Sequence, residues 1–276
     1  MRKEAVTSRE YKVMLRENRF TGDEAQLLKA AGEFRRDLKK AVKAIVIEVD
    51  GDLARIKTRR LIRFYDTAGH HLIEGQYIFR ERHEPITDER EVTLKFRHPD
   101  RYLAEDRDMD AAPGAGDGDG NTARTKFEED IKAPFASLYS FSTTLHIPRN
   151  KELNKLKDVA RMFPGIVNRL NGFPDGKALV VVDGFTAREL VIVGASLQLA
   201  KTPNVAAECG LIVWYDHARS DKKPVVVEFS FRYGDKNENY SGGVVRRAFE
   251  AFRTLQAKLD KWVDPKKGTK TAYVYS

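Results

Sequence analysis

The chain lacks the features that mark disulfide-bonded, secreted or membrane-spanning proteins. Its 276 residues include a single cysteine, Cys209, so neither an internal disulfide nor a multi-cysteine zinc site can form. No apolar run approaches the roughly 20 residues that a transmembrane helix needs. The charged start, Met1 to Glu4, is not followed by the apolar segment of a signal peptide. These absences predict a cytoplasmic location and no membrane association, and they leave the oligomeric state open.

The chain has fewer acidic than basic residues. The 49 lysines and arginines outnumber the 41 aspartates and glutamates, which gives a formal net charge of +8. Such an excess favours anionic partners, of which nucleic acid is the usual one. The cations are spread along the chain and form no dense basic tail. A compact phosphate-rich anion therefore fits the charge distribution at least as well as a nucleic acid, which is disfavoured as a partner.

The most informative segment is 91–97, EVTLKFR. Strict alternation predicts a β-strand with Thr93, Lys95 and Arg97 on one face and apolar side chains on the other. The apolar face can join a core. A strand face that points into solvent usually mixes signs of charge, whereas this one presents two cations at a spacing of two.

Two further segments repeat this pattern. Arg80 and Arg82 share a face in the segment upstream, and Lys126, Glu128 and Asp130 share a face in the segment downstream. Charge that recurs on one face of successive strands predicts a charged cavity. The alternative is the solvated face of a sheet, on which these cations pair with Glu128 and Asp130 across strands.

Hydrophobic spacing predicts an α+β fold. Helices are expected at residues 24–43, 150–170 with a break near Pro164, and 244–262. Hairpin or turn signals occur at 50–52 and 183–184. The expected strands are 8–15, 44–49, 53–65, the three charged segments, 178–182, 189–199, 210–217, 225–233 and 269–275. We predict a single domain over 1–276 with a closed or nearly closed antiparallel sheet.

Residues 105–124 differ in composition from the rest. The segment is rich in glycine and aspartate and has little to bury, so it predicts a mobile loop. Because it joins two expected strands, we interpret it as a long hairpin loop inside the domain.

The charged motifs, in their order along the chain, resemble those of the triphosphate tunnel metalloenzymes, also called the CYTH superfamily. The matching segments are Ser8-x-Glu10-x-Lys12, Tyr65-Asp66-Thr67, Arg80-x-Arg82, Thr93-Leu94-Lys95, Lys126-x-Glu128-x-Asp130, Glu228 in its strand, and Thr269-Lys270 after the last long helix. Two positions depart from the family pattern. Ser8 replaces the first glutamate of the Glu-x-Glu-x-Lys strand, and Ser230 replaces a second acid in the late strand. Asp66 can equally be a turn cap that accepts hydrogen bonds from nearby backbone amides.

The resemblance implies an eight-stranded antiparallel β-tunnel with flanking helices that binds a triphosphate together with Mg²⁺ or Mn²⁺. Members of the family hydrolyse inorganic or organic triphosphates, cyclise ATP or polymerise polyphosphate. The implied roles are catalysis for Glu10 and Lys12, triphosphate binding for Arg80, Arg82, Lys95, Arg97, Lys126 and Lys270, and metal binding for Glu128, Asp130 and Glu228.

Elementary chemistry agrees with that implication. Guanidinium groups bind phosphate oxygens in a bidentate manner, and carboxylates from separate strands are the ligands that a hard divalent cation prefers. We therefore expect a metal-dependent triphosphate hydrolase. One alternative is a degenerate tunnel that binds polyphosphate or nucleotide without turnover, because of Ser8 and Ser230. The other is a basic RNA-binding β-domain, which the position of Phe79 and Phe96 on the apolar face disfavours.

Overall fold

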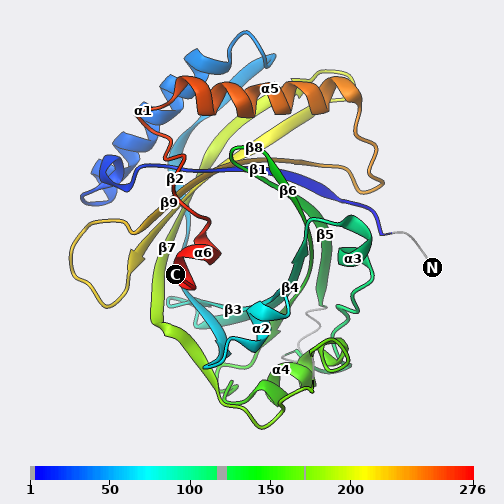
Figure 1. Cartoon of the computed structure of the whole chain (residues 1–276). Coiled ribbons are helices and arrows are strands. Elements are labelled where there is room, and N and C mark those ends of the chain that lie inside the picture. Colours follow the sequence, from blue (N-terminus) through cyan, green and yellow to red (C-terminus); the bar gives the residue numbers. More distant parts are fainter. Residues whose placement is uncertain (1–3, 117–122, 171) are drawn as a thin grey trace.

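The computed structural model describes residues 4–116, 123–170 and 172–276. In this part of the chain nine strands form one closed barrel (Figure 1), in the order β1-β5-β6-β4-β3-β2-β7-β8-β9. The strands are β1 (Ser8–Met14), β2 (Glu48–Thr67), β3 (Tyr77–Glu84), β4 (Glu89–His98), β5 (Arg124–Lys132), β6 (Ala136–Ile147), β7 (Leu179–Ala200), β8 (Val205–Asp216) and β9 (Val226–Gly234).

Helices connect and cover the strands. The α-helices are α1 (Glu24–Val42), α2 (His71–Glu74), α3 (Arg101–Glu105), α4 (Leu156–Met162), α5 (Gly242–Lys258) and α6 (Lys270–Val274). Two 3₁₀ turns, η1 (Glu17–Phe20) and η2 (Pro164–Ile166), complete the set. The expected break near Pro164 is present, since α4 ends just before it. No helix in the described ranges is long and apolar enough to cross a membrane.

The predicted α+β barrel is confirmed, but the strand number and one pairing differ. We expected eight antiparallel strands, and the described residues form nine. A closed ring with an odd number of strands cannot alternate direction throughout, so at least one neighbouring pair must be parallel. That pair is β1 and β5, in which Ser8 lies beside Glu128 and Glu10 beside Asp130. β1 pairs with β9 in the antiparallel sense and so closes the ring.

Two predicted turns are β-bulges inside long strands. Residues 50–52 form no hairpin but lie within β2, where pairing with β7 shifts after Gly51. Gly51 has φ of 63°, and a Cβ there would lie 1.9 Å from the carbonyl oxygen of Gly194. Asp183 and Gly184 likewise lie within β7, beside a second shift in its pairing with β2. Bulges bend and twist a strand, which lets β2 and β7 follow the curve of the barrel.

The predicted last strand, 269–275, is the helix α6. Thr269 caps it, because its side-chain oxygen accepts a hydrogen bond from the Ala272 amide at 3.2 Å. The nine other strands already close the ring, so no sheet edge remains for this segment to join. Figure 1 shows α6 on the inner side of the sheet.

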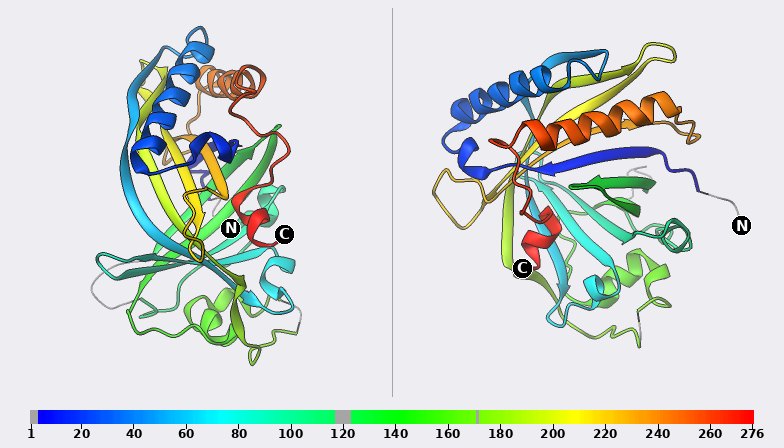
Figure 2. Two further views of the ribbon diagram at one scale, coloured as in Figure 1. Left: turned by 90° about the vertical axis from the view of Figure 1, so that its left-hand side faces the viewer. Right: turned by 45° about the horizontal axis from the view of Figure 1, so that its top comes forward.

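The two large apolar clusters lie outside the barrel. One packs α1 and α5 against the outer faces of β1, β7, β8 and β9, and both helices lie on the same side of the molecule in Figures 1 and 2. The other packs α4 against β3, β4, β5 and β6. Because strand side chains alternate between faces, the apolar residues of β1, β4 and β5 that face the helices leave Glu10, Lys12, Lys95, Arg97 and Asp130 on the inner face.

The predicted loop at 105–124 is described only in part. α3 ends at Glu105, and residues 106–116 follow it without a strand. Residues 117–122 lie outside the described residues. The mobility of this loop stays a prediction.

Replacing Phe34 by Ala should destabilise the fold strongly. Phe34 is fully buried on α1, with ring centroids 4.9 Å from Phe229 and 5.6 Å from Trp262. We expect the free energy of unfolding in a urea titration to fall by about 3 to 5 kcal/mol. The control is Phe135→Ala, since Phe135 is 51% exposed; its loss should be about 1 kcal/mol or less. Equal losses in the two variants would contradict the outer core described above.

Candidate anion-binding site

Side chains from three strands meet on the inner face of the barrel around Asp130. Its Oδ1 accepts a hydrogen bond from Lys12 Nζ of β1 at 2.7 Å. Its Oδ2 lies 3.5 Å from Lys95 Nζ and 3.4 Å from Arg97 Nη2, both on β4. Lys12 also contacts Glu10 Oε2 at 2.9 Å. The structure thus brings together five of the residues that the sequence predicted for the site.

Burial and neighbouring charge shift the pKa values of this cluster in opposite directions. Burial acts to raise the pKa of Asp130, but the charges of Lys12 and Lys95 hold it well below its usual range. Burial acts to lower the pKa of Lys12, but Asp130 and Glu10 raise it. Burial does lower the pKa of Lys95, to about 8. Lys95 therefore shares Asp130 with stronger partners and is the group whose charge a bound anion would stabilise most.

A second pair lies where α6 meets the barrel. Lys270 Nζ donates to Glu228 Oε1 of β9 at 2.7 Å, and Arg97 Nη1 donates to Thr271 Oγ1 at 3.3 Å. A small cavity of about 50 Å³ lies between these groups and the Asp130 cluster. Beyond it, Val274 packs into a third apolar cluster with residues of β2, β3, β7, β8 and β9. Lys270 thus reaches the site from a capping helix and not from the strand that the sequence predicted.

Arg80 and Arg82 carry positive charge that the protein does not neutralise. Among the described residues no carboxylate oxygen lies within 4 Å of Arg80, and its buried Nε has no hydrogen-bond partner. Burial, with the nearby charge of Arg82, places the pKa of Arg80 well below its usual value. Within the described residues Arg82 has one carboxylate partner, Glu91 at 3.8 Å, and donates a long hydrogen bond to Thr93 Oγ1 at 3.4 Å. Burial lowers its pKa to about 10. Two neighbouring arginines are therefore half-buried, each with its Nε shielded from solvent, and have little opposite charge beside them.

Sequence reasoning missed one buried network beside these arginines. Arg60 Nε donates to Glu189 Oε1 at 2.6 Å, and Trp214 Nε1 donates to Glu189 Oε2 at 2.7 Å. Burial acts to raise the pKa of Glu189, but Arg60 and Lys270 outweigh it and lower the pKa to about 2. Neither Arg60 nor Glu189 has a charged neighbour two residues away that would repeat the alternating pattern. Only the pairing of β2, β7 and β8 brings the three side chains together.

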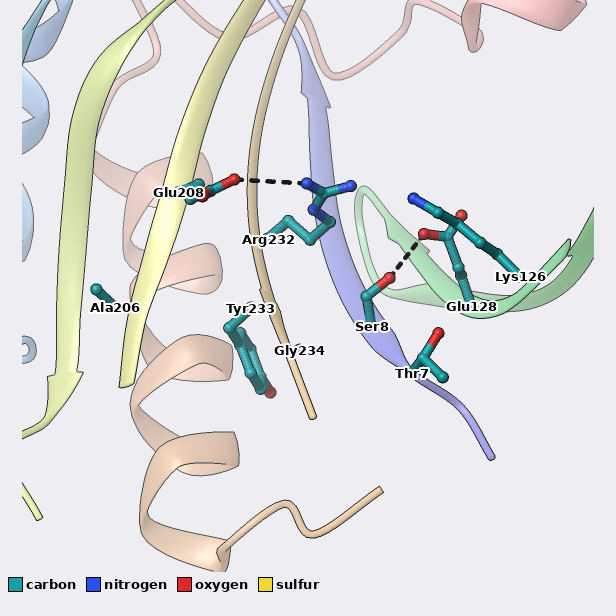
Figure 3. A pocket seen from close by; sticks show the side chains of 9 residues that line it. All are labelled: Thr7, Ser8, Lys126, Glu128, Ala206, Glu208, Arg232, Tyr233 and Gly234. Carbon is teal, nitrogen blue, oxygen red and sulfur yellow. Dashed lines mark hydrogen bonds and ion pairs between the residues drawn. The ribbon is translucent and has the colours of Figure 1, made fainter. Parts of the chain in front are cut away.

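The predicted residues Lys126 and Glu128 lie apart from Asp130, in a cavity of about 310 Å³ at one end of β1. Figure 3 shows Ser8 and Glu128 joined by a hydrogen bond, Lys126 beside them, and Arg232 paired with Glu208 across the cavity. The Ser8 hydroxyl donates to Glu128 Oε1 at 2.8 Å. Lys126 is exposed, so this region is more open to solvent than the Asp130 cluster.

The predicted metal ligands do not form a cluster of their own. Glu128 bonds to Ser8, Asp130 contacts three cations, and Glu228 contacts Lys270. No group of three or more His, Cys, Asp or Glu side chains suited to a metal ion occurs in the described residues. Glu10 and Asp130, neighbours across β1 and β5, offer two carboxylates. Magnesium is commonly held by one or two carboxylates plus substrate phosphates, so this donor set fits a cation that arrives with a phosphate ligand.

Asp66 belongs to the fold and not to the site. Its Oδ1 accepts from the Leu72 amide at 2.9 Å and its Oδ2 from the Ile73 amide at 3.0 Å. The carboxylate therefore caps the start of α2, as the turn-cap interpretation of Tyr65-Asp66-Thr67 expected.

Comparisons with known proteins give structural similarities only. No family model matches the chain, and no curated protein matches it. A candidate adenylyl cyclase from Hippeastrum, HpAC1, described as having a dominant triphosphatase activity, is similar with a TM-score of 0.44 at 13% identity, over 95% of this chain and 93% of that one. Candidate adenylate cyclases from Bacillus halodurans and Vibrio parahaemolyticus each have a TM-score of 0.36, at 10% and 9% identity, over 100% and 99% of this chain and 100% of theirs. With TM-scores below 0.5, these similarities define no activity for this chain.

Replacing Glu189 by Gln should remove a pH-dependent part of the stability. The folded-state pKa is about 2 and the ordinary value is 4.5. The ionised carboxylate therefore stabilises the fold above pH 4.5, and this contribution is lost as the pH falls towards 2. We expect the variant to lose about 3 kcal/mol of unfolding free energy at pH 7, and the difference from the parent protein to shrink below pH 4.5.

Urea titrations between pH 7 and pH 3 measure this effect. Glu208→Gln is the matched control, because the Glu208 side chain is 79% exposed; its effect should stay within about 0.5 kcal/mol at every pH. A Glu189→Gln difference that does not vary with pH would show that the Arg60–Glu189 pair is not the source.

Proposed function

We propose that this protein binds the triphosphate group of a small molecule inside the barrel and hydrolyses its phosphoric anhydride. The observation that carries the proposal is Arg80, a half-buried arginine whose Nε is shielded from solvent and which has no carboxylate within 4 Å among the described residues. A buried charge without a partner is unfavourable unless a ligand completes it. Arg82, Lys95 and Arg97 add charge nearby, so the completing ligand carries several negative charges.

The cations suit a phosphate chain in kind as well as in number. Arg80, Arg82 and Arg97 can each offer two parallel N–H groups to phosphate oxygens. Lys12, Lys95 and Lys270 act as point charges along the same inner face, and Lys126 meets the ligand near the open end. An anion that enters would compete with Asp130 for Lys95 and Arg97, whose contacts with Asp130 Oδ2, at 3.5 and 3.4 Å respectively, are long.

Hydrolysis of an anhydride asks the protein mainly for positioning and for stabilisation of charge on the transferred phosphoryl group. The guanidinium groups supply that stabilisation. Glu10 is held beside Lys12, and that charge keeps its pKa low although burial acts to raise it. As an ionised acceptor, Glu10 is placed to orient an attacking water, while Lys12 fixes its position.

We include Mg²⁺ or Mn²⁺ as the cofactor. Glu10 and Asp130 would hold the ion together with phosphate oxygens, and Glu128 and Glu228 are further candidate ligands from the sequence. A divalent cation supplies charge neutralisation at the phosphate chain. The cytoplasmic location stays a prediction.

A second candidate function is binding of polyphosphate or nucleotide without turnover. The specific observation in its favour is that Ser8 and Ser230 provide hydroxyls where the resembled family has acids, while Asp130 already contacts three cations. RNA binding has less support, because Phe79 and Phe96 are buried in the outer cluster and offer no stacking surface.

Arg80→Met should separate a ligand-binding role from a structural one. The substitution removes a half-buried charge that has no carboxylate partner and keeps an unbranched apolar chain. The ligand-free protein should therefore unfold at a higher temperature. Affinity for inorganic triphosphate, measured by calorimetry, should fall about 10- to 100-fold, as expected for loss of a charge-assisted hydrogen bond. Arg188→Met, on the outer face, is the control. A lower melting temperature with unchanged affinity would contradict the proposed role.

Release of phosphate from inorganic triphosphate and from ATP tests the enzymatic part. We expect turnover with Mg²⁺ or Mn²⁺, its loss with EDTA, and a decrease of at least tenfold in Arg80→Ala and in Glu128→Ala. Arg188→Ala should retain activity. Tight triphosphate binding with no turnover under any of these conditions would favour the second candidate, and unchanged turnover in both variants would remove Arg80 and Glu128 from the site.

A further inference from the structure

A second pocket, of about 450 Å³, lies on the outside of the barrel. Its walls come from the start of α1, the outer faces of β2, β7 and β8, and the loop after β8. Strand register explains why it is separate from the inner site. Leu61, Arg188 and Tyr215 form one row across β2, β7 and β8, on the face opposite to the adjacent row of Arg60, Glu189 and Trp214. The sheet lies between the two rows, and of the inner row only Arg60 also contributes to the lining of the outer pocket.

The floor of this outer pocket is apolar. Leu61, Leu190 and Tyr215 line it, and only 6% of Leu190 and 4% of Tyr215 remain exposed. Both belong to the apolar cluster that packs under α1, so the floor is held in place by the core. Its volume lies in the range of small-molecule sites, which are concave, mostly apolar and rimmed by a few polar groups.

The rim carries an excess of positive charge. Arg188 lies with its guanidinium carbon 4.9 Å from the ring centre of Tyr215, and neither Arg188 nor Lys222 has a carboxylate within 4 Å in the part of the chain that the structure describes. The two acids at the rim are already engaged. Glu24 forms a two-point contact with Arg59, and Asp23 caps α1 by accepting from the Gln26 amide. The rim therefore favours an anionic ligand.

We infer that the outer pocket binds a small organic anion, a flat apolar ring system that carries one acidic group. The ring would lie on Leu61, Leu190 and Tyr215, where it loses contact with water, and the acidic group would meet Arg188 and Lys222. A bare phosphate chain has no apolar surface to place on this floor, so the pocket selects a ligand class different from that of the inner site. The inference does not depend on the proposed function.

Two fluorescent probes that differ in charge test the inference. The first is 8-anilinonaphthalene-1-sulfonate, which carries one negative charge, and the second is its neutral analogue N-phenyl-1-naphthylamine. Titrations are made on the folded full chain with and without saturating inorganic triphosphate, which competes with the probes for any cationic site in the barrel that binds it. We expect saturable binding of both probes with one site per chain.

Variants at exposed or half-buried positions locate the binding. Arg188→Glu should weaken the sulfonate probe at least tenfold and leave the neutral probe within about twofold, because only the ionic contact is reversed. Leu61→Asp should weaken both probes at least tenfold. Arg36→Glu, the same charge reversal on the exposed side of α1, should change neither. Circular dichroism spectra verify that each variant is folded.

Three results would overturn the inference. One is a sulfonate affinity unchanged in Arg188→Glu, and another is probe binding that does not saturate. The third is complete displacement of the sulfonate probe by inorganic triphosphate, which would place the probe inside the barrel. Phosphate release by Arg188→Glu should equal that of the parent protein, so failure of this inference is distinguishable from failure of the proposed function.

Discussion

The contact of Asp130 with cations from two other strands is the interaction on which the inner site depends. One carboxylate holds Lys12 of β1 and Lys95 and Arg97 of β4 from its place on β5. Without it, three half-buried positive side chains would lie close together with no carboxylate among them but Glu10. Burying several like charges is strongly unfavourable unless opposite charge is supplied. Asp130 supplies enough to keep the cluster assembled but not enough to neutralise its surroundings.

Charged groups inside the barrel are of two kinds, those that are fully paired with opposite charge and those that are not. The Arg60–Glu189 pair is complete, with Trp214 satisfying the second carboxylate oxygen. It behaves as a structural element, whose contribution depends on ionisation of Glu189. Arg80 has no carboxylate partner, and its partial burial is an unfavourable contribution to stability that a bound anion would offset. Arg80 thus lowers stability in the absence of a ligand, whereas the Arg60–Glu189 pair raises it.

The strands β2, β7 and β8 present a different chemical surface on each of their two faces. Alternation along β2, β7 and β8 places Arg60, Glu189 and Trp214 inside while Leu61, Arg188 and Tyr215 face outward. A change in register of one residue would exchange the two rows and place the charged network under α1. The bulges at Gly51 and near Asp183 bend these strands without exchanging the faces of these rows.

The alternating charges of the sequence were enough to predict which residues of β1, β3, β4 and β5 share one face, because side-chain direction in a strand follows a period of two. That this face lines the inside of a ring was decided by the tertiary structure. The helices α1 and α5 followed from apolar spacing in the same way. Local sequence pattern did not predict the parallel contact of β1 and β5, the helical state of residues 270–274, or the Arg60–Glu189–Trp214 network. These depend on ring closure and on which strands become neighbours, which are contacts between residues far apart in the chain. Local pattern determines where a side chain points, and only the tertiary structure decides what it meets.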